Sequence, residues 1–159
     1  MNTDLIPIDK HGEVKYFDLH TFKDLVNKQP RAEWIKTNKY AQNARYIPIG
    51  IVEELLRGIF PFHEIIQSGQ PQILGNSVVI SVQLRVFNPI LGDWQSYAGV
   101  GAVPIEVEKG AHPTDFTKIN SKAMHKNVPA ALSFAINNAA KKIGKLFGSH
   151  INRGNDEQL

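Results

Sequence analysis

The sequence SVVISVQLRV, at residues 77–86, changes the hydrophobic period of this chain from that of a helix to that of a strand. Side chains that recur every two residues lie on one face of a β-strand. In this stretch every second residue is a large apolar one, and these are Val78, Ile80, Val82, Leu84 and Val86. We therefore expect a half-buried strand with one face against the core.

The segments around residues 77–86 predict that this strand belongs to an antiparallel sheet. Turn-forming residues follow at 88–93, where the sequence reads NPILGD, and a return strand is expected from Trp94 to Val103. A shorter strand is expected from Phe62 to Gln67. Because strands that follow one another in sequence tend to pair, we expect a β-meander of three or four strands.

Two helices are predicted before the sheet. The first is short, with an apolar face that follows the capping residue Asp18. The second begins at Pro48, which suits a first helical position, and Pro61 stops it. Residues 31–47 are polar and mixed, and we expect a short helix around Trp34 followed by a loop.

A third helix is predicted from Pro129 to Phe147, after a loop at residues 105–120 and after a helical start expected at Lys122 and Lys126. Its apolar arc is rich in alanine, which allows close packing on a sheet. Lys141 and Lys145 are four residues apart and are expected to be stacked on the opposite side. Gly148 suits the end of this helix. The helices and the meander together predict an α+β fold.

Composition excludes several classes of protein. The chain has 159 residues, 42% of them hydrophobic, which suits a globular domain with a core. It has no cysteine, so disulfides, thiolate metal sites and cysteine nucleophiles are absent. We see no apolar run as long as a membrane span and no signal peptide at the N-terminus. The expected protein is soluble and cytoplasmic, and no cofactor is predicted.

Charge is distributed unevenly along the sequence. Residues 116–154 hold seven basic side chains and no acidic one, although the whole chain has a net charge of only +3. Lysines without neighbouring carboxylates favour a polyanionic ligand, and nucleic acid is the commonest. The candidate contacts in this segment are Lys122, Lys126, Lys141, Lys142 and Lys145.

Arg45 and Tyr46 lie immediately before the second helix. An aromatic ring beside a cation can stack on a base while the cation holds a phosphate. The alternative is a tyrosine that packs beneath the start of a helix.

No catalytic signature is complete. The dipeptide Gly144-Lys145 lacks the glycine of a phosphate-binding loop, and His63-Glu64 lacks the second histidine of a zinc protease. Magnesium-dependent nucleases need clustered carboxylates. Only Glu106, Glu108 and Asp115 come close to such a cluster, and we keep a small metal-dependent nuclease as an alternative.

Three segments together resemble the single-strand annealing domain of the eukaryotic recombination mediator Rad-fifty-two and its bacteriophage relatives. These are Arg45-Tyr46-Ile47-Pro48 with the helix that follows, the meander from 78 to 102, and residues 139–148, which read AAKKIGKLFG. The family's last helix ends with two adjacent basic residues, a third basic residue and then Phe-Gly. The resemblance covers about residues 35–150, with an N-terminal segment at 1–34 and a polar tail at 151–159.

This resemblance implies a β-β-β-α core that assembles into a homo-oligomeric ring. Single-stranded DNA would lie in a basic groove, and the family is not enzymatic and uses no nucleotide. By position in the family pattern, the DNA-binding residues are Lys36, Tyr46, Lys122, Lys141, Lys142 and Lys145. Arg45, beside Tyr46, and Lys126, in the basic segment, complete the predicted set. Pro129 departs from the family pattern, and it leaves the placement of Lys122 and Lys126 open.

The predicted function is therefore annealing of complementary single strands in recombination and repair. Further partners of such a protein would be a single-strand-binding protein or an exonuclease of the phage or its host, and a phage protein would act in the host cytoplasm. A plain single-strand-binding protein remains the main alternative. It should present more aromatic platforms than Tyr40, Tyr46 and Tyr97.

Overall fold

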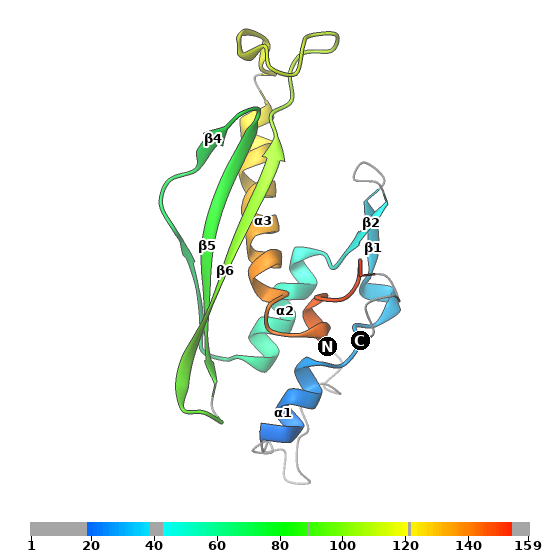
Figure 1. The fold of residues 1–159 in the computed structure, drawn as a ribbon, viewed down its shortest axis with the longest axis vertical. Coiled ribbons are helices and arrows are strands. Elements are labelled where there is room, and N and C mark those ends of the chain that lie inside the picture. The colour runs from blue at the N-terminus through cyan, green and yellow to red at the C-terminus, as the bar shows by residue number, and fades with distance from the viewer. Residues whose placement is uncertain (1–18, 39–42, 89, 121, 154–159) are drawn as a thin grey trace. The chain divides into compact units, whose positions relative to one another are not determined.

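The computed structural model describes residues 19–38, 43–88, 90–120 and 122–153. Within these ranges the fold is α+β, with two antiparallel sheets and three α-helices (Figure 1). None of the helices in the described ranges has the length and apolar character needed to cross a membrane. The elements are α1 (Leu19–Val26), the 3₁₀ helix η2 (Ala32–Trp34), β1 (Lys36–Asn38), β2 (Ala44–Tyr46), α2 (Ile49–Ile59), β3 (His63–Gln67), β4 (Gln72–Leu74), β5 (Ser77–Asn88), β6 (Asp93–Pro104), η3 (Phe116–Lys118), α3 (Ala123–Ala140) and η4 (Lys145–Phe147).

The described residues form two compact units. The first unit holds the residues up to 63, residues 86–95 and the residues from 140 onward. The second unit holds residues 64–85 and 96–139. Strands β3, β5 and β6 and helix α3 contribute residues to both units, since His63, residues 86–88, residues 93–95 and Ala140 belong to the first.

The sheet of the second unit is centred on β5, since β3, β4 and β6 each pair with it. The predicted alternation is confirmed, because every second residue of β5 is buried from Val78 to Asn88. All three predicted strands are present, and β4 is a fourth, with Ile73 opposite Val78. Because β3 and β4 both pair with β5, the sheet is not a simple meander.

Helix α3 lies unusually close to β6 in the second unit. A Cβ atom added to Gly101 would lie 2.0 Å from the carbonyl oxygen of Ala131, and one added to Gly99 would lie 2.1 Å from that of Ala135. Real Cβ atoms do not approach backbone so closely, so only glycine fits at either position. The alanine-rich arc predicted for this helix therefore does allow close packing, because glycines on the strand face it.

The core of the first unit is formed by α1, α2 and η4. The rings of Phe22 and Phe60 meet edge to face with their centroids 5.9 Å apart, and η4 packs against α1. The buried residues include the apolar faces predicted for both helices, namely Phe22, Leu25, Val26, Val52, Leu55, Leu56 and Phe60. Pro48 is the N-cap of α2 and so precedes its expected position by one residue. Asp18, the predicted cap of α1, lies outside the described residues.

The prediction of a loop before α2 is wrong. The short helix at Trp34 is present as η2, but β1 and β2 then form an antiparallel hairpin. Each strand has only three residues, so no alternation is long enough to be recognised in the sequence.

The predicted limits of the third helix are also wrong. Helix α3 begins earlier, at Ala123, and contains Pro129; it ends at Ala140. Residues 141–143 form a turn, and Gly144 has an extended backbone with φ of 169°. A Cβ atom at Gly144 would lie 2.3 Å from the carbonyl oxygen of Val26. Gly144 can therefore lie against α1 only because α3 ends before it. Gly148, with φ of 91°, ends the 3₁₀ helix η4 and not the third α-helix, as was predicted.

Candidate nucleic-acid interface

Among the described residues, most of the basic excess lies in the first unit. Among its described residues, ten are Lys or Arg and five are Asp or Glu. The described residues of the second unit include five basic and four acidic ones. Six of the eight predicted DNA contacts lie in the first unit, and they are Lys36, Arg45, Tyr46, Lys141, Lys142 and Lys145.

The β1–β2 hairpin brings Lys36 and Tyr46 together. They are direct partners in the ladder, and Thr37 is the partner of Arg45. Residues directly opposite each other in an antiparallel pair project to the same face, with Cβ atoms about 4.5–5.5 Å apart. Lys36 is exposed and Tyr46 is half-buried. An ammonium and an aromatic ring at this spacing suit the phosphate and the base of one nucleotide.

Arg45 has a structural role that the sequence did not indicate. Its guanidinium donates a hydrogen bond to the carbonyl oxygen of Ile151. Its backbone N–H donates to Oδ1 of Asn152 at 2.8 Å, and Nδ2 of Asn152 donates to the Arg45 carbonyl oxygen at 2.7 Å. These bonds join β2 to a segment more than one hundred residues later in the chain. The guanidinium that we expected at a phosphate therefore holds the hairpin to the C-terminal segment.

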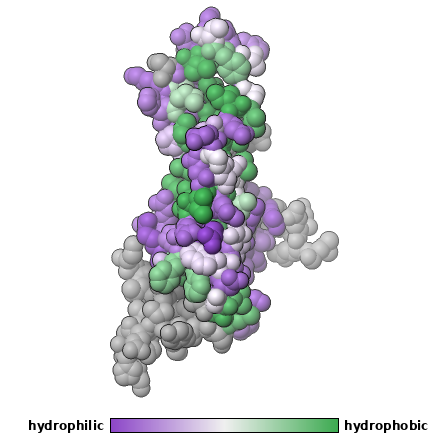
Figure 2. Space-filling view, turned by 90° about the vertical axis from the view of Figure 1, so that its left-hand side faces the viewer, coloured by the Kyte–Doolittle hydropathy of each residue, from purple (hydrophilic) through white to green (hydrophobic). Residues whose placement is uncertain are grey.

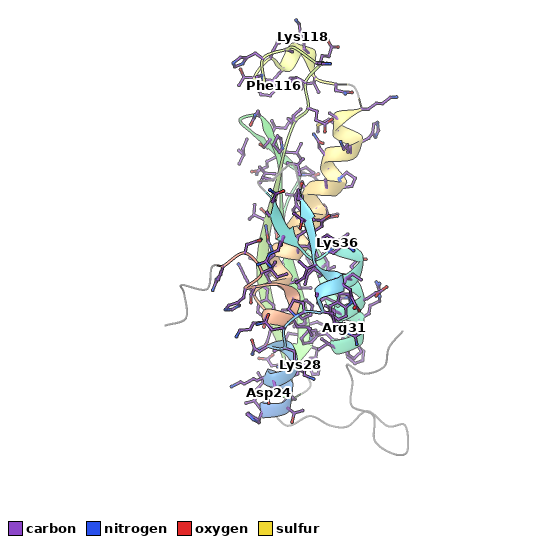
Figure 3. The ribbon with its side chains drawn as sticks, turned by 90° about the vertical axis from the view of Figure 1, so that its right-hand side faces the viewer. Asp24, Lys28, Arg31, Lys36, Phe116 and Lys118 are labelled. Atoms are coloured by element: carbon purple, nitrogen blue, oxygen red, sulfur yellow. The ribbon has the colours of Figure 1, made fainter. Side chains whose placement is uncertain are left out.

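Three basic residues accompany Trp34 in the segment that runs from the end of α1 into β1. Figure 3 shows Lys28, Arg31 and Lys36 one after another along one side of the first unit. The guanidinium of Arg31 lies 5.3 Å from the ring centroid of Trp34, and one of its nitrogens is 3.6 Å from a carboxylate oxygen of Glu33. We call Lys28, Arg31 and Lys36 the basic row. Lys28 and Arg31 were not among the contacts predicted from the sequence, although the spacing of cations around Trp34 indicated them.

Lys141 and Lys145 do not share a helical face, which corrects the sequence prediction. Lys141 lies in the turn after α3, and Lys145 is the first residue of η4. Lys142 is exposed, whereas Lys141 and Lys145 are half-buried. Desolvation by this burial lowers the pKa of the Lys141 ammonium. Of the three, Lys142 is therefore the most accessible to a phosphate.

The two remaining predicted contacts lie in the second unit. The exposed Lys122 directly precedes α3, and its backbone N–H bonds to Oδ1 of Asn120 at 3.0 Å. Nζ of Lys126 lies 2.9 Å from Oε1 of Glu106. The segment free of carboxylates in the sequence is therefore not free of them in space. An exposed ion pair of this kind contributes about 0–1 kcal/mol.

The structure also describes most of the residues on which the two alternative functions, a nuclease and a plain single-strand-binding protein, were based. Glu106 pairs with Lys126, and Oδ1 of Asp115 accepts hydrogen bonds from the backbone and hydroxyl of Thr117. Within the described ranges, no group of three or more His, Cys, Asp or Glu residues could hold a metal ion. Tyr97 is half-buried in β6, and burial raises its pKa; Tyr40 lies outside the described residues.

Comparison with known proteins identifies no family. No family model matches the chain, and no curated protein sequence matches it significantly. The side chains of the first unit and the sequence resemblance therefore support the function that follows.

Proposed function

We propose that this chain binds single-stranded DNA and anneals complementary strands without nucleotide hydrolysis. The observation that carries the proposal is the pairing of Lys36 with Tyr46 on one face of the β1–β2 hairpin. This pair belongs to the unit with twice as many basic as acidic side chains among its described residues. An aromatic platform next to a cation, within a basic surface, is the chemistry that holds single strands without reading their sequence.

The proposed mechanism is physical. The basic row and Lys142 would neutralise phosphates of one strand, while Tyr46 would hold a base by its face. Contacts to phosphates fix position and carry no sequence information, so base edges stay available to a second strand. Neutralising phosphates also reduces the repulsion between the two strands. Watson–Crick pairing then selects the complementary strand.

The proposal includes a homo-oligomer, with a ring as its expected form. Strands β3 and β4 expose four large aliphatic side chains, Ile65, Ile66, Ile73 and Leu74, which are between 38% and 58% exposed. Neither strand contains a lysine or a proline, which natural edge strands often use to prevent pairing. Figure 2, seen from the β4 side of Figure 1, shows apolar surface exposed among polar residues. A second subunit that covers this edge would remove the apolar surface from water.

Salt dependence of binding tests the proposal. The affinity for a fluorescent oligothymidine should fall linearly in a log–log plot against salt, with a slope of about −0.7 per neutralised phosphate. The variant Lys36→Gln/Lys142→Gln should bind more weakly and give a shallower slope. Arg57→Gln is the matched control, because Arg57 is exposed on α2 near Glu53 and lies outside the basic row. An affinity that does not depend on salt would contradict the proposal.

A protein that only protects single strands is the second candidate. Such a protein should present more aromatic platforms, and Trp34 beside Arg31 adds one to Tyr46 beside Lys36. The two candidates differ in one property, because only an annealing protein accelerates pairing of complementary strands. The partners expected from the resemblance, a single-strand-binding protein or an exonuclease, belong to the annealing proposal.

A further inference from the structure

The loop between β6 and α3 is held in one shape by its own backbone. Val107 and Ile119 form an antiparallel bridge. The Glu108 N–H donates to the Lys118 carbonyl oxygen at 2.8 Å, and the Asn120 N–H donates to that of Glu106 at 3.0 Å. A ladder of this kind fixes both ends of the loop, which Figure 1 shows beyond the end of β6 and the start of α3.

The tip of this loop is ordered by side chains. Asp115 caps η3 by accepting from the backbone N–H of Thr117 at 3.1 Å, and it also accepts from the Thr117 hydroxyl. His112 and Thr114 are joined by a bond of 2.7 Å between Nδ1 and Oγ1. The short helix η3 therefore has a defined orientation, and so does the residue that begins it.

That residue is Phe116, and 47% of it is exposed. Burying a phenylalanine side chain contributes about 1.5–3 kcal/mol, so an exposed ring on a braced loop does little for folding. Figure 3 shows Phe116 and Lys118 together at the end of the loop. They are two residues apart, so their Cα atoms are at most about 7.6 Å apart.

Charge around Phe116 favours an anionic ligand. Lys109, Lys118 and Lys122 are exposed, and none of them forms an ion pair with a carboxylate of the described residues. Of the three carboxylates in this loop, Glu106 is paired with Lys126, which leaves Glu108 and Asp115 against the three lysines. The loop therefore keeps a small excess of positive charge, and Lys118 lies two residues from the ring.

We propose that Phe116 is a stacking platform for a base of single-stranded DNA and that Lys118 contacts the adjoining phosphate. This second contact lies in the second unit and rests on the proposed function of the first. Every base has a π-face, so stacking on Phe116 requires no particular sequence. The contact would hold a base of one strand apart from its neighbours, and so available for pairing.

The test uses oligothymidines that contain one abasic site, with the full-length protein. Phe116→Ala should weaken binding to the intact oligonucleotide about 5- to 100-fold, and Phe116→Trp should restore it. The wild-type protein should bind the abasic oligonucleotide more weakly, and Phe116→Ala should discriminate less, because only the stacking at Tyr46 remains. Phe134→Ala is the matched control, because Phe134 is 40% exposed on α3 of the same unit.

Each other outcome overturns the inference in a distinguishable way. If the wild-type protein binds the oligonucleotide and Phe116→Ala binds equally well, the stacking site is wrong and the proposed function survives. If Phe116→Ala instead changes the oligomer mass in light scattering without changing discrimination, the ring belongs to a protein contact. If the wild-type protein binds no oligonucleotide, the proposed function and the stacking site both fail.

Discussion

Lys36 and Tyr46 lie directly opposite each other in the ladder between β1 and β2, and their side chains leave the hairpin on the same face. They are ten residues apart in the sequence. The hairpin therefore brings together two side chains that are distant in the sequence. Arg45, between them in sequence, fastens the hairpin to Ile151 and Asn152, so the pair is presented from an anchored ribbon.

Replacing Tyr46 should separate stacking from packing. We expect Tyr46→Leu to weaken single-strand binding by about 1–3 kcal/mol, because leucine has no π-face. Tyr46→Phe keeps the ring and should bind as the wild-type protein does. Fluorescence anisotropy gives both affinities, and Lys36→Gln in each background measures the coupling between the two side chains. Equal binding by the leucine and phenylalanine variants would show that the ring does not stack on a base.

Lys141 should make stability depend on pH in a defined direction. Desolvation lowers its pKa below the ordinary 10.5, so the folded protein binds fewer protons than the unfolded chain between the two values. Stability therefore rises as pH rises through that window, and the penalty is fully present below it. Lys141→Met should be more stable than wild type at neutral pH, with an advantage that shrinks toward pH 10.5. Urea unfolding at several pH values measures this, and an advantage that grows with pH would contradict it.

Close packing of α3 on β6 should make Gly101 irreplaceable. Gly101→Val forces a side chain into backbone only 2.0 Å away, and overpacking of this kind costs about 1–3 kcal/mol or more. Gly58→Ala is the control, since a Cβ atom at this helical position would meet nothing within 4 Å. Alanine at position 58 should raise stability by about 0.5–1 kcal/mol. Thermal unfolding that ranks the two variants in the opposite order would show that α3 and β6 are not in close contact.

The exposed edge of the second unit should mediate self-association. Ile73→Lys/Leu74→Lys places two charges on β4, where both side chains are 58% exposed. Substitutions at exposed positions usually change stability by no more than about 0.5 kcal/mol. The melting temperature should therefore stay unchanged while the mass of the oligomer falls. Light scattering gives the mass, and Gln72→Lys in the same strand tests whether charge alone is sufficient. A wild-type protein that stays monomeric at micromolar concentration, with and without DNA, would rule out the ring.

The sequence predicted those parts of the fold that depend on long periodic patterns. The alternation in β5 and the apolar faces of α1 and α2 were readable because each repeats several times. The β1–β2 hairpin was not, because two strands of three residues show no period. The end of α3 at Ala140 was missed for another reason. Continued helical spacing through Phe147 concealed the contact between Gly144 and Val26, which is distant in sequence.

The candidate site was likewise predicted only in part from the sequence. Charge counts indicated basic residues and assigned them to the C-terminal third, whereas most of the excess among the described residues lies in the first unit, which takes only part of that third. The ion pair of Lys126 with Glu106 joins residues twenty positions apart. Residue types therefore indicated a class of ligand, and only tertiary contacts showed which side chains remain accessible.

Annealing of two complementary, dye-labelled oligonucleotides is the most direct test of the central claim. Energy transfer between the dyes should rise faster with the wild-type protein than without it, in the absence of any nucleotide cofactor. The variant Lys36→Gln/Tyr46→Leu/Lys142→Gln should lose this acceleration, and Arg57→Gln should keep it. A wild-type protein that binds single strands and fails to accelerate their pairing would contradict the account, as would a triple variant that anneals at the wild-type rate.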